Sequence, residues 1–369
     1  MAVEKADLAI VGASAAGLAA ALAAARAGAD VLLLESKSDI GAPAAPAIVG
    51  FDMLWPAAIP RPAYTVRRRL GGLTLRASDG RGPEIDAPLT LFDRARFDAH
   101  LAAEAEKAGA RIVTGLADLR VRDDKRLVAA GFEAQADVLL FADGARTQAA
   151  RFLRPTRDPE ELAWGAILDL EAPGDGDRLA LTLGPHAPGG RSQLNPLGEG
   201  HWSHWTFFRG DVAAAEAVAR HALAVDARIQ GWREGDVRAR FAGVAPDPVY
   251  TLPRELARGN VLVAGGAAGQ GGLEVGLASG WMAGEAAARG DLAGYARAWR
   301  KRYQGGYERL RTVTDMLTRL TDDETRALLG AWDARRLAAP PTPRALLRAG
   351  GARGFAAGAR AALVAWARG

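Results

Sequence analysis

A short glycine-containing motif has the residue types and spacing that phosphate binding requires. It reads Gly12-Ala13-Ser14-Ala15-Ala16-Gly17, follows an apolar run at 8–11 and opens an Ala- and Leu-rich stretch. The first glycine permits a tight turn, and the last lets a helix and a strand pack closely. The N–H groups and positive dipole end of such a helix attract a pyrophosphate. The motif therefore predicts a dinucleotide site formed by Gly12, Ser14, Ala15, Ala16 and Gly17.

A carboxylate stands where the ribose of such a dinucleotide is usually held. Glu35 lies 18 residues after Gly17, at the end of the apolar run 30–35, and Ser36 follows it. A carboxylate there holds ribose hydroxyls and repels a 2′-phosphate, so we expect an adenosine with a free ribose at Glu35 and Ser36. Ser14 departs from the usual second glycine but is small enough for close approach. The alternative interpretation is a glycine-rich turn of another α/β fold.

The elements that must position these residues follow from apolar patterning. Buried strands over 7–11 and 30–35 flank a helix over 14–27, and together they predict a βαβ unit with a right-handed crossover. Asp93 is the expected N-cap of a later helix. The further elements expected on this side of the chain are a helix over 93–107, strands over 111–114, 137–141 and 260–264, and a helix over 273–288.

A second sheet is predicted for the middle of the chain. Strand-like pieces at 166–170, 179–183 and 201–208 alternate with Gly/Pro turns at 185–191 and 196–200, which favours antiparallel pairing. A helix is expected over 211–224, and 51–92 reads as short strands and turns. The fold class is therefore α/β. We expect a Rossmann-type domain from 1–155 plus 250–300, an inserted antiparallel-sheet substrate domain over 156–249, and a helical C-terminal region over 301–369.

Composition excludes several classes of site. The chain has 369 residues, 49% of them apolar, and can bury a sizeable core. It has no cysteine, which excludes disulfides, Cys-ligated metals and a cysteinyl-flavin link. A net charge of +4 is no nucleic-acid signature. We expect no metal site, no transmembrane helix and a cytoplasmic location.

Three later segments resemble the geranylgeranyl reductase family, within the wider FAD-dependent group that includes aromatic hydroxylases. Residues 93–101 (DRARFDAHL) resemble its DRxxFDxxL helix, 142–147 (ADGART) its ADGxxS turn, and 260–280 (NVLVAGGAAGQGGLEVGLASG) its second glycine-rich segment. Their order and spacing match over more than half of the chain. The resemblance implies that the dinucleotide is FAD and that the protein is an oxidoreductase.

The same resemblance implies further cofactor contacts. Arg94 would face the flavin phosphate or ribityl chain, and Asp143 would lie in a turn beside the flavin, with Gly144 at a positive φ. Gly272 and Leu273 would bring backbone N–H groups to the isoalloxazine carbonyl edge. Gly266 stands where the family has an aspartate for a ribityl hydroxyl. The alternatives are a surface arginine, an ordinary strand-end turn and a plain helix start.

Two departures concern the substrate. The loop 41–46 (GAPAAP) has no counterpart of the reductases' cysteine near Pro46, and 188–196 (PGGRSQLNP) lacks both aromatics of their YxWxFP stretch. No second dinucleotide motif follows a strand in the middle of the chain. Electrons would therefore come from transiently docked NAD(P)H or from a separate reductase.

Three functions stay open on the sequence alone. The first is a reductase that transfers hydride from flavin to double bonds of a small hydrophobic substrate, with isoprenoids as one class. The second is a monooxygenase that hydroxylates such a substrate, and the third is a non-catalytic flavin-fold protein. Flavin does its own hydride chemistry, so we name no catalytic side chain.

The aromatic stretch at 201–208 could serve either the core or a substrate pocket. His201 and His204 are three apart in a strand and should lie on opposite faces. The neighbouring aromatics are Trp202, Trp205, Phe207 and Phe208. Burial in the core and contact with a hydrophobic substrate are both open to them.

The segment 344–369 offers a peripheral membrane contact. Phe355, Ala359, Leu363 and Trp366 fall on one helical face, flanked by arginines. A basic amphipathic helix of this kind can lie on the inner face of a membrane. The alternative is a helix packed on its own domain.

Overall fold

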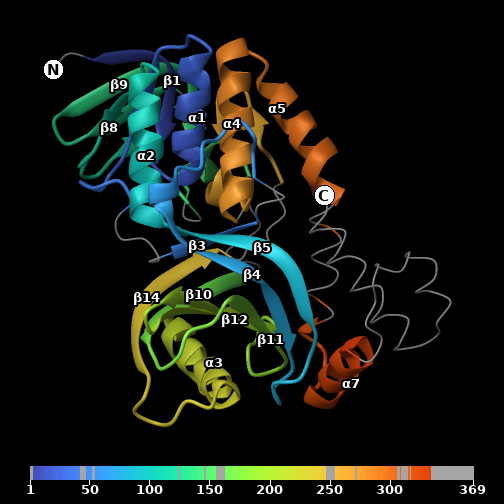
Figure 1. Ribbon diagram of the computed structural model, residues 1–369. Coiled ribbons are helices and arrows are strands. Elements are labelled where there is room, and N and C mark those ends of the chain that lie inside the picture. Colours follow the sequence, from blue (N-terminus) through green and yellow to red (C-terminus); the bar gives the residue numbers. More distant parts are fainter. Residues whose placement is uncertain are drawn as a thin grey trace.

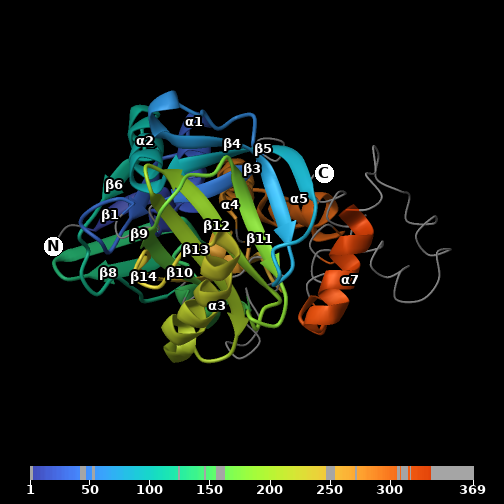
Figure 2. The ribbon, with the colours of Figure 1, turned by 60° about the horizontal axis from the view of Figure 1, so that its bottom comes forward.

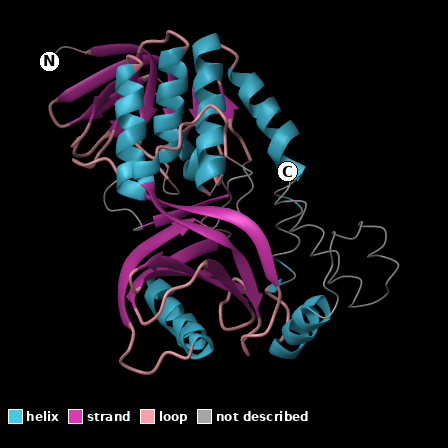
Figure 3. Cartoon of the chain, in the orientation of Figure 1, coloured by secondary structure: helices cyan, strands magenta, loops and turns pink. Residues whose placement is uncertain are grey.

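Two β-sheets organise the part of the chain that the computed structural model describes. That part comprises residues 3–41, 47–51, 55–123, 125–144, 147–154, 163–246, 254–270, 272–305, 308, 315 and 317–333. A helix-covered sheet lies in the upper half of Figure 1 and a second sheet in the lower half, and Figure 3 separates the helices and strands by colour. The loop 42–46 and the segment 344–369 lie outside the described residues, so the expectations for them stay predictions.

The first sheet is parallel at its centre. Within the described residues its order is β15 (Ala257–Arg258), β16 (Val261–Val263), β9 (Phe132–Phe141), β1 (Glu4–Val11), β2 (Val31–Leu34) and β6 (Arg111–Val113). β1 pairs in parallel with β2 and β9, and β16 pairs in parallel with β9. The antiparallel strands β7 (Arg120–Val121) and β8 (Arg126–Ala129) extend it beside β9. The expected βαβ unit is confirmed, because α1 (Ala15–Arg26) connects β1 to β2.

Small residues let two helices of this half approach unusually closely. α1 lies between α2 (Arg94–Lys107) and α4 (Leu273–Arg289), so it is buried on nearly every side. An added Cβ at Gly280 would lie 2.0 Å from the Ala16 carbonyl oxygen, and one at Gly284 would lie 2.2 Å from that of Ala20. Glycine is therefore required at both positions of α4.

We expect Gly284→Ala to destabilise the protein despite alanine's higher helix propensity. The added methyl group cannot fit against Ala20 unless the helices separate, and overpacking of this kind costs about 1–3 kcal/mol. Urea unfolding measures the change. Gly276→Ala on the same helix is the matched control, because its new Cβ would meet nothing within 4 Å. Equal stability of the two variants would contradict the close packing.

The second sheet is mostly antiparallel, as expected, but contains one parallel pair. Within the described residues its order is β14 (Arg238–Pro246), β10 (Ala163–Glu171), β13 (His201–Arg209), β12 (Arg191–Gly198), β11 (Arg178–Leu183), β4 (Val66–Arg76), β5 (Glu84–Asp93) and β3 (Ala47–Phe51). The parallel pair joins β11 and β4, which are about a hundred residues apart in the chain.

This topology corrects two expectations. The stretch 51–92 forms long strands that pair with the second sheet, so a boundary at residue 155 does not separate the two sheets. Residues 191–198 form one continuous strand, and the turns expected at 185–191 and 196–200 overlap its two ends. Pro196 is tolerated in that strand because the register shifts between Pro196 and Gly198, where a proline need not donate to the ladder.

Helices cover the second sheet in two places. A short 3-10 turn, Val212–Ala214, precedes α3 (Ala215–Gln230), which runs past the expected end because the left-handed residue is Gly231. α3 packs on the sheet face that lies away from the first sheet (Figures 1 and 2). α7 (Asp322–Asp333) and Leu317 pack near Leu75 and Leu183 at one end of the sheet.

The first half closes with α5 (Leu292–Trp299) and a π-helical turn, Arg300–Gln304. Tyr295 and Trp299 of α5 are fully buried against the first sheet's core. Across the described residues, no helix combines the length and the apolar character needed to cross a membrane.

Candidate functional site

The motif residues gather at one edge of the first sheet. Val11 of β1 is in register with Leu34 of β2 and with Phe141 of β9, and Phe141 is in register with Val263 of β16. These four parallel strands therefore end together, and the segments that follow them meet there. Ligands of open α/β sheets bind in this crevice beyond the carboxyl ends of the strands.

Gly12 and Ser14 shape the start of α1. Gly12 has a φ of 101°, and an added Cβ would lie 2.7 Å from the Ala142 carbonyl oxygen. Ser14 is the N-cap: its hydroxyl accepts from the Gly17 N–H at 3.4 Å and donates to the Ala142 carbonyl at 2.9 Å. Ser14 thus takes the place of the usual glycine, and its hydroxyl is used to cap α1 and to bind the Ala142 carbonyl. Gly17 in turn lets α1 lie against the Gly12 carbonyl.

The Glu35 carboxylate is held against this turn. Its Oε2 accepts from the Ala13 N–H at 2.7 Å, and its Oε1 accepts from the Ser36 hydroxyl at 3.1 Å and the Lys37 N–H at 3.0 Å. Glu35 is half-buried, and Ser36 is exposed. The carboxylate is therefore fixed at the mouth of the crevice, where a ribose hydroxyl can reach it.

Arg94 is oriented by a buried carboxylate to which the sequence motifs assign no role. Asp93 caps α2 as expected, accepting from the Arg96 N–H at 3.0 Å. The Arg94 guanidinium donates to both oxygens of Asp98, with the shortest contact at 2.7 Å. Burial raises the pKa of Asp98, against the opposing effect of Arg94. The bidentate pair holds the guanidinium in one orientation. The loop that follows Glu35 lies beside Arg94, because Gly41 of that loop packs on Ala95.

The Asp143–Gly144 turn lies directly on the glycine motif. Gly144 has the expected positive φ, 83°. Asp143 Oδ2 accepts from the Gln148 N–H at 2.8 Å, while the buried Oδ1 has no hydrogen-bond partner among the described residues. Burial raises the pKa of Asp143, against hydrogen bonds from Thr147 and Gln148. A buried oxygen of this kind suits a hydroxyl or amide donor of a bound ligand.

The second glycine-rich segment completes the edge from the other side. After β16 the chain makes a 3-10 turn, Gly265–Ala268, and then enters α4 at Leu273. Gly266 lies beside Gly144: its added Cβ would be 3.6 Å from the Gly144 Cα. Gly272, with a φ of 89°, caps α4 without a side-chain hydrogen bond, so the first N–H groups of α4 are not capped by a side chain.

Three buried polar residues lie behind this segment, and none was predicted from the sequence. Gln270, Ser279 and Tyr295 form hydrogen bonds around the Gly265 N–H. Only Ser279 and Gln270 fall within the motif-like stretch, and Tyr295 lies in a helix that carries no motif. Polarity alone does not single out Ser279 or Tyr295, because α4 and α5 both carry other polar side chains.

The Gly266 position yields a direct prediction. We expect Gly266→Asp to strengthen FAD binding by roughly two- to tenfold, because one added hydrogen bond contributes about 0.5–1.5 kcal/mol. The backbone accepts a side chain here, since an added Cβ would make an ordinary contact with the Gly144 Cα. Titration of the apoprotein with FAD measures the change. Gly266→Ala is the control for side-chain bulk, and equal affinities of the two variants would show that the aspartate finds no partner.

The histidines and aromatics of β13 divide between the two faces of the second sheet. His201 is exposed and His204 fully buried, which confirms that they lie on opposite faces. Trp202 and Phe208 pack under α3 in the core. Trp205 and Phe207 lie on the other face, where the Arg191 guanidinium stacks 3.9 Å from the Phe207 ring centre. Trp202 and Phe208 therefore serve the core. Contact with a substrate stays a prediction for the face that carries Trp205 and Phe207.

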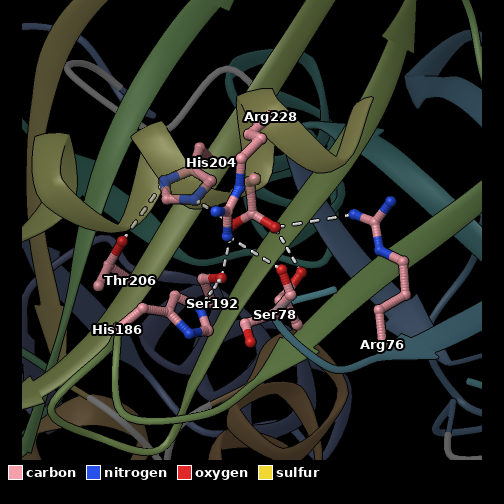
Figure 4. A network of polar contacts seen from close by, with 9 residues as sticks. Arg76, Ser78, His186, Ser192, His204, Thr206 and Arg228 are labelled. Atoms are coloured by element: carbon pink, nitrogen blue, oxygen red, sulfur yellow. Dashed lines mark hydrogen bonds and ion pairs between the residues drawn. The ribbon is translucent and has the colours of Figure 1, made fainter. Parts of the chain in front are cut away.

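His204 belongs to a buried polar network centred on Asp226 of α3. Asp226 accepts from Ser192 at 2.6 Å, from His204 at 2.8 Å and from Thr182, and Arg76 lies 3.7 Å away. Figure 4 shows Arg76, Ser192 and His204 converging from different elements. The network lies under α3, away from the glycine motifs. Among the described residues, no His, Asp or Glu group has the arrangement of a metal site.

Comparison with known proteins identifies the family. A family model described as FAD dependent oxidoreductase matches residues 7–142. The chain is 30% identical over 349 residues to digeranylgeranylglycerophospholipid reductase 1 of Methanothermobacter thermautotrophicus, covering 84% of this chain and 82% of that protein. It is 26% identical over 369 residues to a protein of the same description from Methanosphaera stadtmanae, covering 88% of each.

Solved structures agree on the fold. A geranylgeranyl bacteriochlorophyll reductase-like protein from Thermoplasma acidophilum superposes with a TM-score of 0.78 at 18% identity, over 94% of this chain and 96% of that one. An anhydrotetracycline hydroxylase from Streptomyces rimosus gives 0.61 at 19% identity, over 97% of this chain and 76% of that one. Fold similarity alone does not define the family, but 30% sequence identity along most of both chains does. The chain therefore belongs to the digeranylgeranylglycerophospholipid reductase family of FAD-dependent oxidoreductases.

Proposed function

We propose that this enzyme reduces carbon–carbon double bonds of an isoprenoid lipid with hydride from FAD. The observation that carries the proposal is the 30% identity to a digeranylgeranylglycerophospholipid reductase across 84% of the chain. Electrons would reach the flavin from transiently docked NAD(P)H or from a separate reductase.

The residues at the sheet edge fit FAD. The start of α1 would hold the pyrophosphate, Glu35 and Ser36 the adenosine ribose, and Arg94 the phosphate or ribityl region. The buried Asp143 Oδ1 offers an acceptor that no described protein group uses. Gly266 and Gly144 leave room beside it, because neither carries a side chain.

When bound, FAD supplies the hydride, and the protein supplies position and electrostatics. The N–H groups of Gly272 and Leu273 at the start of α4 would favour negative charge on the carbonyl edge of a bound, reduced ring. The proton that completes reduction would come from solvent or from a group in the substrate pocket.

The second sheet supports a hydrophobic substrate. The face not covered by α3 carries a cluster of buried leucines contributed by β4, β5, β11 and β12. These are Leu70, Leu89, Leu91, Leu179 and Leu197. Trp205 and Phe207 continue the apolar character along β13. The leucines are buried against one another, and the half-buried Trp205 on the same face is the candidate contact for a hydrophobic substrate.

The test is anaerobic turnover of a geranylgeranyl-bearing glycerophospholipid by the FAD-loaded, dithionite-reduced enzyme. We expect product that has gained one H2 for each double bond reduced, measured by mass spectrometry. A Gly12→Ala chain without FAD controls for reduction by dithionite alone. Unchanged lipid under these conditions would contradict the proposal, and oxygen incorporation under air with NADPH would instead establish a monooxygenase.

A further inference from the structure

We propose that Gln270, Ser279 and Tyr295 are positioning residues for the flavin. They fix the Gly265–Gly266 backbone at the point where this chain carries no polar side chain toward the cofactor. The inference rests on the use of FAD in the proposed function and goes beyond it, because it assigns a role to three side chains outside the crevice itself.

The backbone in question lies where three parts of the flavin site meet. Gly265 has a φ of 64°, and an added Cβ would lie 2.6 Å from the Ala16 Cβ in the first turn of α1. Gly266 lies beside Gly144 of the Asp143–Gly144 turn. The same segment leads into the N-terminus of α4. A shift of this backbone would therefore affect the start of α1, the Asp143–Gly144 turn and the start of α4.

Two of the three side chains hold the Gly265 N–H directly. It donates to Gln270 Oε1 at 3.0 Å and to Ser279 Oγ at 3.1 Å. Ser279 Oγ in turn donates to the Gly276 carbonyl at 3.0 Å. The Gln270 N–H also donates to the Gly265 carbonyl at 2.9 Å. The N–H and the carbonyl of Gly265 are thus both tied to Gln270, and the N–H also to Ser279.

Tyr295 anchors this arrangement to α5. Its hydroxyl donates to the Val263 carbonyl at 2.9 Å and accepts from Gln270 Nε2 at 3.2 Å. Burial raises the pKa of Tyr295, so the hydroxyl keeps its proton and remains a donor. The end of β16, the glycine-rich turn and α5 are therefore joined through one side chain.

Burial makes these hydrogen bonds decisive for the backbone. Gln270, Ser279 and Tyr295 are at most 2% exposed, so a lost partner cannot be replaced easily by water. The turn that they hold consists of Gly265, Gly266, Ala267 and Ala268, which have little or no side chain of their own to define it. Glycine is the most conformationally permissive residue, so the turn depends on its neighbours for a single conformation.

The experiment compares FAD affinity with stability in Tyr295→Phe and Ser279→Ala. Each removes one hydroxyl and keeps the rest of the side chain. We expect the Kd for FAD, from fluorescence titration of the apoprotein, to rise by about five- to tenfold in each, as loss of about one hydrogen bond implies. Thr206→Val is the matched control: it removes an equally buried hydroxyl under α3 and should lower the Tm without changing the Kd.

Rescue gives a second readout. Gly266→Asp combined with Tyr295→Phe should restore FAD affinity, because a side-chain ligand then substitutes for the fixed backbone. A Kd equal to wild type in both single variants, with only the Tm lowered as in Thr206→Val, would overturn the proposal. That outcome differs from failure of the proposed function, in which the FAD-loaded wild type leaves the lipid unreduced. A wild-type chain that takes up no FAD would overturn both.

Discussion

Asp226→Ala should lower the free energy of unfolding by about 3–5 kcal/mol, a large share of the stability of a typical protein. The substitution removes the acceptor shared by Thr182, Ser192 and His204 and leaves the Arg76 guanidinium without its counter-charge. All of these groups are buried, and Asp226 itself is 0% exposed. Breaking a buried pair on one side costs more than the pair contributes, because the remaining charge stays desolvated.

The same carboxylate predicts how stability depends on pH. Burial alone would raise the pKa of Asp226, but the hydrogen bond and charge of His204, together with Ser192 and Thr182, outweigh burial and lower it to about 2. The unfolded chain then binds a proton near pH 4, before the folded chain does. The stabilisation is therefore fully present above about pH 4 and is lost as the pH falls toward 2.

Urea unfolding at neutral pH and at pH 3 measures both effects. Glu216→Ala is the matched control on the same helix, because its pair with Arg220 is exposed and contributes roughly 0.5 kcal/mol or less. The difference between wild type and Asp226→Ala should shrink at the lower pH. A loss of about 1 kcal/mol or less at neutral pH, close to the effect of an average substitution, would show that the network is not what holds α3 on the sheet.

Gly12→Ala should abolish FAD binding, with the affinity lowered by about a hundredfold or more, as a strained and crowded backbone implies. The new methyl group would lie 2.7 Å from the Ala142 carbonyl oxygen and 2.9 Å from the Asp143 Cα. It also places alanine at a φ of 101°. The chain can accept the substitution only by moving the glycine-containing turn at the start of α1 or the turn that carries Asp143.

Flavin content after desalting, read from the visible spectrum, measures this loss. Gly28→Ala is the matched control: its φ is 88°, but an added Cβ meets nothing within 4 Å. It carries the same backbone strain without the crowding, and it should retain FAD. Full flavin content in Gly12→Ala would mean that the close approach of the two turns is not needed for binding.

Local signals in the sequence predicted the flavin-binding half well. The βαβ unit, the Asp93 cap, the positive φ of Gly144 and the start of α4 at Leu273 each depend on residues within one turn or one motif. The absence of the family's aspartate at Gly266 could also be recognised from the sequence, because it needs only the residue type at one motif position. FAD dependence followed from these segments together, since each is a weak signal by itself.

Long-range pairing was not predictable in the same way. Nothing near Leu73 or Leu179 indicates that β4 and β11 lie side by side, because the partners are far apart in sequence. The Asp226 network likewise joins residues from separate elements, and each is an ordinary polar residue in its own context. The same holds for Tyr295, whose partners belong to β16 and the glycine-rich turn.

The order of the first sheet has a consequence for synthesis on the ribosome. β16 pairs with residues 139–141 of β9, so this part of the β9 edge stays unpaired until residues 261–263 have left the exit tunnel. α1 likewise lacks its tightly fitting partner α4 until residue 284 is available. The nascent flavin-binding half must therefore persist with a partly open strand edge and an uncovered alanine helix while β10 to β14 of the second sheet are being made. Chains truncated between residues 142 and 260 should for this reason associate with chaperones or aggregate rather than fold alone.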